Sequence, residues 1–259
     1  MLPSLGKVAN CKVVVTAHYT DFKRGFPVDL ATYHKNQESK IELAKNLIFQ
    51  SLKIFPYLKH ISFDSWYAKS SLIWFINSLK LFWYSKLRED RIVIYQGELM
   101  RASGLVKATA TLFTRPDKRF IDLRQVWVKN LGYCRLVIDK ITEEHVVTNN
   151  PSLPPEKVFE YYGLRWKIDE FYREAKDNLA FDQFQIRKDS SIKRHWYLVF
   201  LAYTFWIHSK LKAVMSKIYQ GTLKTLSEMA KVIQNLNLLK LAIQPTNVLM
   251  LNLSLKVIN

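Results

Sequence analysis

The chain has 259 residues, enough to bury one large hydrophobic core. Hydrophobic residues make up 49% of it, with only 8 Pro and 7 Gly, which argues against a disordered protein. Lys and Arg (39) outnumber Asp and Glu (22), giving a formal net charge of +17. This charge favours nucleic acid as the partner, with a generally basic composition as the alternative.

The same sequence disfavours a membrane or secreted protein. Its longest apolar run, residues 196–207, is shorter than the roughly 20 residues that a bilayer span requires. The N-terminal segment MLPSLGKVANCK has no apolar stretch typical of a signal peptide. Cys11 and Cys134 give neither a disulfide framework nor a zinc-binding spacing. We therefore expect a cytoplasmic protein without membrane contact.

The first part of the chain alternates apolar β-branched runs with segments of helical periodicity. Asp64 directly follows one of the short runs. The predicted elements, in chain order, are an antiparallel strand pair (11–17 and 26–30), a helix (38–55), a strand (60–63), a helix (68–80) and two strands (82–87 and 91–95).

The second part begins with β-rich pieces and ends in helices. Pro154 and Pro155 are typical of a first helical turn. Gly163 costs this helix about 1 kcal/mol relative to alanine, so we expect a kink or close packing there. The predicted elements are a β-rich region (105–147), one helix from Pro155 to about residue 178, a long apolar helix (192–214), a weaker helix (223–239) and an apolar tail. This pattern alone indicates only an α+β or α/β fold.

One stripe of the helix predicted beyond Pro155 concentrates polar chemistry. At about 100° per residue, its members lie within about 80° of one another. An acid, a phenol and three cations on one stripe suggest a surface that faces phosphate and metal. These residues are Tyr162, Arg165, Asp169, Arg173 and Lys176.

The spacing Tyr162-x2-Arg165-x3-Asp169-x6-Lys176 resembles the Tyr-Arg-Glu-Lys signature of DDE transposases of bacterial insertion sequences, the IS-four-like group. The segments RWKIDEFYREAKDNLAFDQFQIR and FDSWYAKSSL resemble the same family. The resemblance runs roughly from VVVTAHYTDF to WYLVFLAYTFW. The signature Glu is replaced by Asp169, one methylene shorter, and Glu170 lies off the stripe.

The resemblance implies a ribonuclease-H-like core with a β-rich insertion and C-terminal helices, N-terminally incomplete. It implies DNA as the partner, at the ends of an insertion sequence, in a nucleoid-associated bacterial protein. The corresponding parts are 1–104 (partial core, with the first strand missing or incomplete), 105–150 (β-rich insertion), 151–215 (third-acid helix and following core helix) and 216–259 (C-terminal helical tail).

The resemblance further implies that Asp64 and Asp169 are catalytic acids. A carboxylate at the end of a strand, facing one on a helix, can hold hard divalent cations through oxygen. The family's two-ion site would use Mg²⁺ or Mn²⁺ for strand cleavage and transfer. In the alternative reading, Asp64 caps the following helix and Asp169 pairs locally with Arg165 or Arg173.

The cations of the stripe would position DNA by contacting phosphate oxygens, which adds affinity without reading sequence. Arg165, Arg173 and Lys176 are the expected phosphate contacts, and Tyr162 could hydrogen-bond or stack beside them. The alternative is a solvated basic helix face.

The family's first catalytic Asp lies on an opening strand upstream of a segment like CKVVVTAHYTDF. The preceding residues, MLPSLGKVAN, contain no acid, and Asp21 and Asp29 follow in the wrong place. We therefore expect a truncated, catalytically inactive copy that binds DNA non-specifically. Two other classes remain open: a basic DNA-binding protein without catalytic ancestry, and a regulatory fragment that pairs with itself or with full-length transposase through residues 196–214 or the tail.

Overall fold

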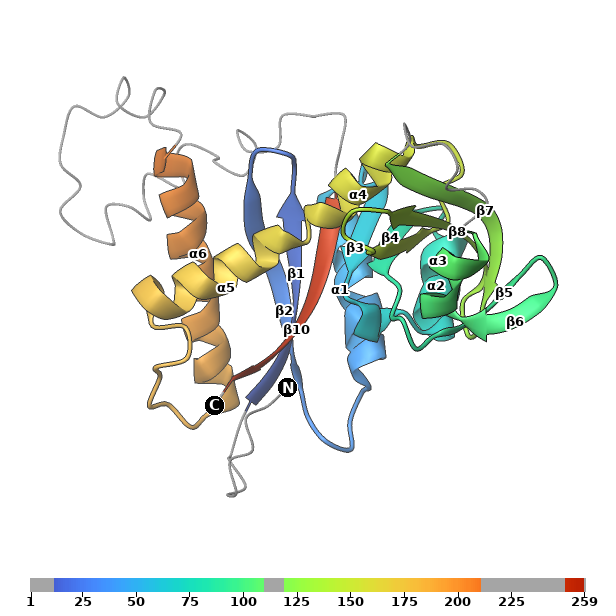
Figure 1. Ribbon diagram of the computed structural model, residues 1–259. Helices are drawn as coiled ribbons and strands as arrows, with labels where there is room; N and C mark the ends of the chain where they lie inside the picture. Colours follow the sequence, from blue (N-terminus) through green and yellow to red (C-terminus); the bar gives the residue numbers. More distant parts are fainter. Residues whose placement is uncertain (1–11, 110–118, 211–249, 259) are drawn as a thin grey trace.

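The computed structural model describes residues 12–109, 119–210 and 250–258. In this part of the chain, strands form one mixed sheet with helices on both faces (Figure 1). The strands are β1 (Lys12–Thr20), β2 (Gly25–Tyr33), β3 (His60–Phe63), β4 (Phe82–Lys86), β5 (Ile92–Tyr95), β6 (Glu98–Arg101), β7 (Phe120–Val128), β8 (Gly132–Asp139), β9 (His145–Thr148) and β10 (Met250–Ile258).

The helices divide between the two faces of the sheet. The first two cover one face, and the last three cover the other. They are α1 (Lys40–Ile54), α2 (Ser70–Ser78), α3 (Leu105–Ala108), α4 (Pro155–Gly163), α5 (Trp166–Leu179) and α6 (Asp189–Lys210), with 3₁₀ turns η1 (Ser65–Tyr67) and η2 (Ala102–Gly104).

The strand order is β2-β1-β10-β3-β4-β9-β8-β7-β5-β6. β10 runs antiparallel to β1 and parallel to β3, and β3 runs parallel to β4. A strand from the C-terminal end therefore lies in the middle of the sheet, between segments far away in sequence (Figure 1). Removing it would leave facing edges of β1 and β3 without ladder hydrogen bonds.

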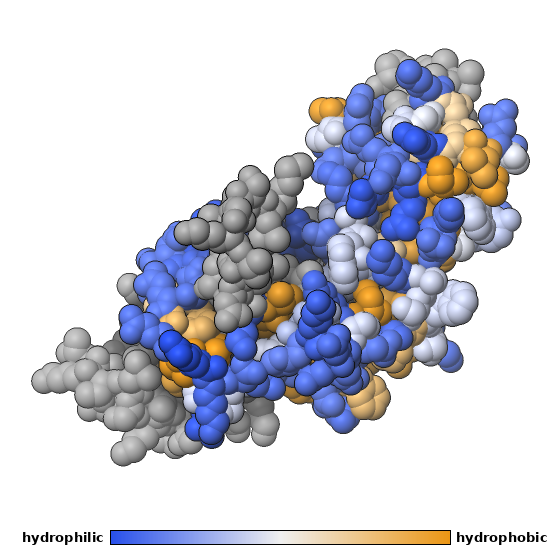
Figure 2. All heavy atoms as spheres, turned by 90° about the horizontal axis from the view of Figure 1, so that it is seen from below, coloured by the Kyte–Doolittle hydropathy of each residue, from blue (hydrophilic) through white to orange (hydrophobic). Residues whose placement is uncertain are grey.

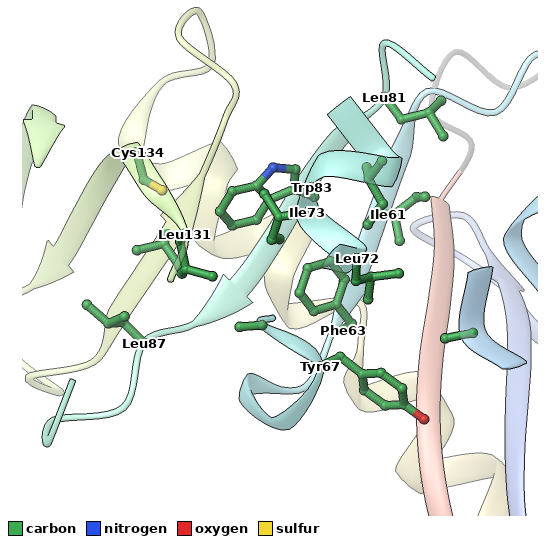
Figure 3. Packing of buried hydrophobic residues seen from close by; sticks show 14 of the residues in the cluster. Ile61, Phe63, Tyr67, Leu72, Ile73, Leu81, Trp83, Leu87, Leu131 and Cys134 are labelled. Carbon is green, nitrogen blue, oxygen red and sulfur yellow. The ribbon is translucent and has the colours of Figure 1, made fainter. Parts of the chain in front are cut away.

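The hydrophobic side chains of β3, β4 and α2 form the core next to Asp64. Phe63 and Trp83 stack at 6.1 Å, and Leu72 packs nearby from α2 (Figure 3). Tyr67 of η1 is also fully buried in this cluster. The end of β3 is therefore held in place by apolar packing on the α2 face.

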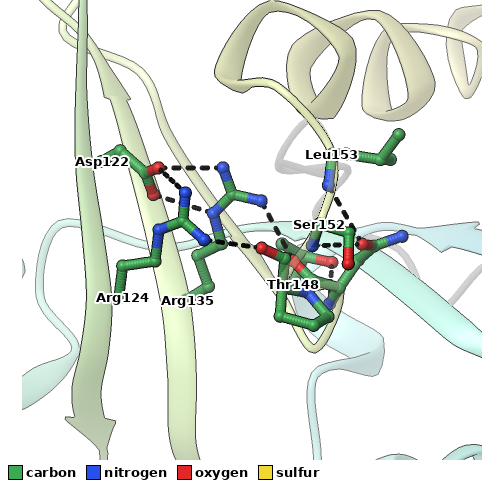
Figure 4. A network of polar contacts seen from close by, with 8 residues as sticks. Asp122, Arg124, Arg135, Thr148, Ser152 and Leu153 are labelled. Carbon is green, nitrogen blue, oxygen red and sulfur yellow. Dashed lines mark hydrogen bonds and ion pairs between the residues drawn. The ribbon is translucent and has the colours of Figure 1, made fainter.

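A polar network fixes the loop that leads from the sheet into α4 (Figure 4). The buried guanidinium of Arg135 donates to both carboxylate oxygens of Asp122 at 2.8 and 3.0 Å. It also donates to the carbonyl of Asn150 at 3.1 Å, while Arg124 donates to the carbonyl of Pro151 at 2.7 Å. These bonds join β7 and β8 to the start of α4.

Most predicted elements are present, and three predictions need correction. The single helix expected to run to about residue 178 is two helices, α4 and α5, which meet after the predicted kink position Gly163. Residues Leu105–Ala108, expected to be β-rich, form a short helix. Residues Met250–Ile258, expected in a helical tail, form β10.

The long apolar helix begins at Asp189, before its predicted start, and any continuation past Lys210 lies outside the described residues. The helix predicted at 223–239 also falls outside them. Trp196, named in a candidate interface, is instead buried, and its indole N–H donates to the carbonyl of Phe181 at 3.1 Å. The division into four domains stays a prediction.

The central position of β10 makes a direct stability prediction. Leu253→Pro should lower the free energy of unfolding by at least about 2 kcal/mol, because proline removes a ladder N–H from a strand with partners on both sides. Leu253→Val keeps the N–H and should change it by less than about 1 kcal/mol. Urea unfolding measures both variants, and equal midpoints for the two would contradict the placement of β10.

Candidate functional site

Asp64 directly follows β3 and is exposed. Its carboxylate accepts hydrogen bonds from the Ser65 hydroxyl at 3.0 Å and from the Trp66 backbone N–H at 3.4 Å, so it caps η1. The alternative reading, in which Asp64 caps the following helix, needs correction, because Asp64 caps the turn η1 and the N-cap of α2 is Lys69. The cap leaves the carboxylate at the surface, where it can also meet a ligand.

The junction between α4 and α5 brings together three of the predicted site residues. Tyr162 lies in the last turn of α4, Arg165 precedes α5, and Asp169 lies in the first turn of α5. An Nη1 atom of Arg165 donates to Oδ2 of Asp169 at 3.1 Å, and the guanidinium lies 5.8 Å from the ring centre of Tyr162. The predicted local pairing of Asp169 with Arg165 is confirmed.

Electrostatic interactions connect this junction to Asp64 on the neighbouring strand. Burial opposes the charge of Arg165, yet Tyr162, Asp169 and Asp64 together hold its pKa above the ordinary value. Burial raises the pKa of Tyr162, and Asp64 adds to this rise while Arg165 opposes it. Arg165 therefore pairs directly with Asp169, and the negative charge of Asp64 makes a smaller contribution that favours the charged form of Arg165.

Sequence reasoning missed Tyr67, which belongs to the same neighbourhood. Burial is the main reason that its pKa lies well above the ordinary value, with Tyr172 and Asp64 adding to the effect. Its hydroxyl is buried without a hydrogen-bond partner among the described residues. The available signal was its position three residues after Asp64, one helical turn further along the chain.

The buried face of α5 packs against β1. Its apolar side chains, including Phe171, join a cluster with β1, β2 and α6. Within this cluster, the hydroxyls of Tyr172 and Thr16 lie 2.7 Å apart, and His18 lies 3.1 Å from the Thr16 hydroxyl. The ring centres of His18 and Phe171 are 4.9 Å apart. These contacts set the place of Asp169, which is three residues before Tyr172 on the same helix.

The other two cations of the predicted stripe lie further along α5. Lys176 pairs with Asp182 at 3.1 Å instead of pointing to the Asp64 neighbourhood. Arg173 is exposed, and its charge opposes the rise of the Tyr203 pKa to about 12, which burial dominates. The predicted stripe assumes one continuous helix. Because the helix breaks between α4 and α5, Tyr162 does not share one helical face with Arg173 and Lys176. Arg173 and Lys176 remain candidate phosphate contacts outside the junction.

The donor set tests whether the site suits divalent cations. Asp64 and Asp169 supply carboxylate oxygens, which Mg²⁺ and Mn²⁺ prefer. In the described ranges, however, no three His, Cys, Asp or Glu side chains gather in a metal-binding cluster. Arg165 also occupies one oxygen of Asp169. Asp64 and Asp169 therefore provide the right type of oxygen ligand for the metal, but they provide fewer ligands than a two-ion site requires.

In a comparison with protein families, the model described as "Transposase DDE domain" matches residues 9–205. A comparison with curated proteins finds no match. Among the helices described, none is both long and apolar enough to cross a membrane.

The buried histidines make stability depend on pH. Burial lowers the pKa of His18 to about 3, and burial followed by the charge of Lys59 lowers that of His60 to about 4. In the unfolded chain both titrate near 6.5, so below that pH the unfolded state binds protons that the folded state does not. Stability should therefore fall from pH 7 to pH 5, by about 2 kcal/mol for His18 alone.

Urea unfolding across this range measures the effect. The range from pH 7 to pH 5 lies above the ordinary pKa of Asp and Glu carboxylates. The change in stability over this range therefore reports the histidines and not the carboxylates. The His18→Gln variant should lose less stability between pH 7 and pH 5 than the unchanged chain does. Equal losses in the two proteins would show that His18 is protonated in the fold.

Proposed function

The chain belongs to the transposase DDE-domain family, whose model matches residues 9–205, and we propose that it binds DNA as a transposase core that is catalytically inactive as it stands. The family normally uses divalent metal ions to cut and join DNA strands. The chain's ancestral chemistry would be strand cleavage and transfer at the ends of an insertion sequence. Its present role is to bind the DNA backbone around the α4–α5 junction.

The single observation that carries this proposal is the grouping of Tyr162, Arg165 and Asp169 at the α4–α5 junction, where Arg165 lies 3.1 Å from Asp169 and 5.8 Å from the ring centre of Tyr162. A phosphate that approaches this group would meet Arg165 directly, with Tyr162 beside it. Guanidinium groups bind phosphate oxygens through paired N–H donors, which gives strong and well-oriented contacts. The strong excess of positive charge over the chain supports the same partner.

The arrangement of the sheet supports a ribonuclease-H-like topology. The antiparallel pair β1 and β2 stands beside the parallel strands β10, β3 and β4, and helices cover both faces. Asp64 follows β3, as the resemblance to the family implies for the second acid. The β7–β9 strands stand between β4 and β5, as an insertion would.

The residues beside Asp64 support the proposed loss of activity. β10 and β1 are the next strands in the sheet, and their sequences, MLNLSLKVI and KVVVTAHYT, contain no acid. Asp29 on β2 accepts a hydrogen bond from the Tyr197 hydroxyl at 2.6 Å. A two-ion site with only two carboxylates should bind metal weakly and cleave little DNA. Pairing with another copy or with full-length transposase stays a prediction.

DNA binding can be measured by fluorescence anisotropy with a labelled duplex at several salt concentrations. The affinity should fall linearly with salt on logarithmic axes, as expected for phosphate contacts. Arg165→Gln should weaken binding by at least about tenfold, because it removes a charged hydrogen-bond donor worth about 1.5–3 kcal/mol. Arg187→Gln, which changes an exposed arginine on the loop before α6, is the charge-matched control and should change binding by less than twofold.

Catalysis can be tested with supercoiled plasmid in Mg²⁺ or Mn²⁺. We expect no nicking above background from the unchanged chain or from Asp64→Ala. Metal-dependent nicking that disappears in Asp64→Ala would contradict the inactive assignment, and loss of all DNA binding in the unchanged chain would contradict the binding role.

A further inference from the structure

An open hollow lies beside Ser65, next to Asp64, and a second hollow adjoins it on the side of β5 and β7. One, of about 430 Å³, is lined by Ser65, which follows Asp64, and by the segment from Lys86 to Asp90. The second, of about 320 Å³, is lined by residues of the same turn and by Lys69, Arg91 and Lys129. Both hollows are lined by Arg88 and Asp90, so they adjoin one another.

The cations of the second hollow come from three separate parts of the chain. Lys69 precedes α2, Arg91 precedes β5, and Lys129 follows β7. Within the described residues none of these three forms an ion pair, although an Nη2 atom of Arg91 donates to the carbonyl of Ala68 at 3.2 Å. Arg88 differs from them, because it is paired with Asp90 at 2.8 Å.

Convergence of positive groups without counter-ions is electrostatically unfavourable unless an anion binds there. Lys69 and Lys129 are both exposed, so their ammonium groups can reach a ligand in the hollow without any change of the fold. Asp90 is the acid that both hollows contain, and Arg88 already neutralises it. The second hollow therefore keeps a net positive charge.

We propose that this hollow, lined by Lys69, Arg91 and Lys129, binds a backbone phosphate of duplex DNA that passes Asp64. The proposal rests on the proposed DNA-binding function and adds a second contact region away from the α4–α5 junction. The two adjoining hollows form a path from Ser65 toward the β7–β8 turn. The first hollow sets Lys86 and Arg88 against Glu89 and Asp90, so the positive charge that would hold a DNA phosphate is concentrated in the second hollow. The face seen in Figure 2 is mainly hydrophilic, with apolar side chains exposed only in separate small areas.

The test uses the double variant Lys69→Ala/Lys129→Ala in the full chain. Loss of one neutralised phosphate should reduce the slope of log affinity against log salt by about 0.9. Affinity for a labelled duplex at low salt should fall by about tenfold. Inorganic phosphate at concentrations equal in ionic strength to the salt series should compete no better than chloride if the site needs the polymer.

The matched control is Lys53→Ala/Lys59→Ala, which removes the same charge. Lys53 lies in the last turn of α1 and Lys59 directly before β3, at the opposite end of that strand from Asp64. Both control residues are exposed, and thermal melts should show all three proteins equally folded. The control should retain at least half of the binding affinity and a nearly unchanged salt slope.

These measurements distinguish the hollow as a site from general DNA binding by the chain. Equal effects of both double variants would overturn the hollow as a site, because general charge would then explain binding. DNA binding that persists unchanged in Lys69→Ala/Lys129→Ala would overturn the hollow but leave the proposed function. Absence of DNA binding by the unchanged chain would overturn both.

Discussion

The packing of Phe171 and Tyr172 on α5 against His18 and Thr16 on β1 determines where the candidate site can form. Burial of each aromatic ring contributes roughly 1.5–3 kcal/mol, and the Tyr172 hydrogen bond roughly 1 kcal/mol. The part-exposed pair of Arg165 and Asp169 is worth at most about 1 kcal/mol. The helix is therefore placed by its buried face, and the charged pair follows from that placement.

Packing in the sheet and a buried ion pair fix the end of β3, next to Asp64, and the loop before α4. Phe63 and Trp83 fix the end of β3 from the opposite face of the sheet, and β10 joins β3 to β1. The buried ion pair of Arg135 and Asp122 anchors the loop before α4. Removing one partner from such a pair leaves an uncompensated charge and costs about 3–5 kcal/mol. Sheet and loop thus determine how α4 meets α5.

Sequence patterns were informative where local packing decides the structure. Strand 60–63 and the position of Asp64 follow from one apolar run and its polar end. The break between α4 and α5 was only partly visible through Gly163, because the two helices pack into different clusters. β10 does carry a local strand signal, because apolar residues alternate with polar ones from Leu251 to Val257, but its place in the sheet depends on strands more than 180 residues away. The hollow around Lys69 also required three distant segments, which no spacing within the sequence could connect.

If the end of β3 and the α4–α5 junction form one site, Asp64 and Arg165 should interact across these two elements. A double-mutant cycle with Asp64→Asn and Arg165→Gln, measured by urea unfolding at low salt, detects this interaction. We expect a coupling free energy of about 0.5–1 kcal/mol that decreases as salt is added, because Asp64 is exposed to solvent. Additivity of the two changes within about 0.3 kcal/mol would contradict a single site formed by these two elements.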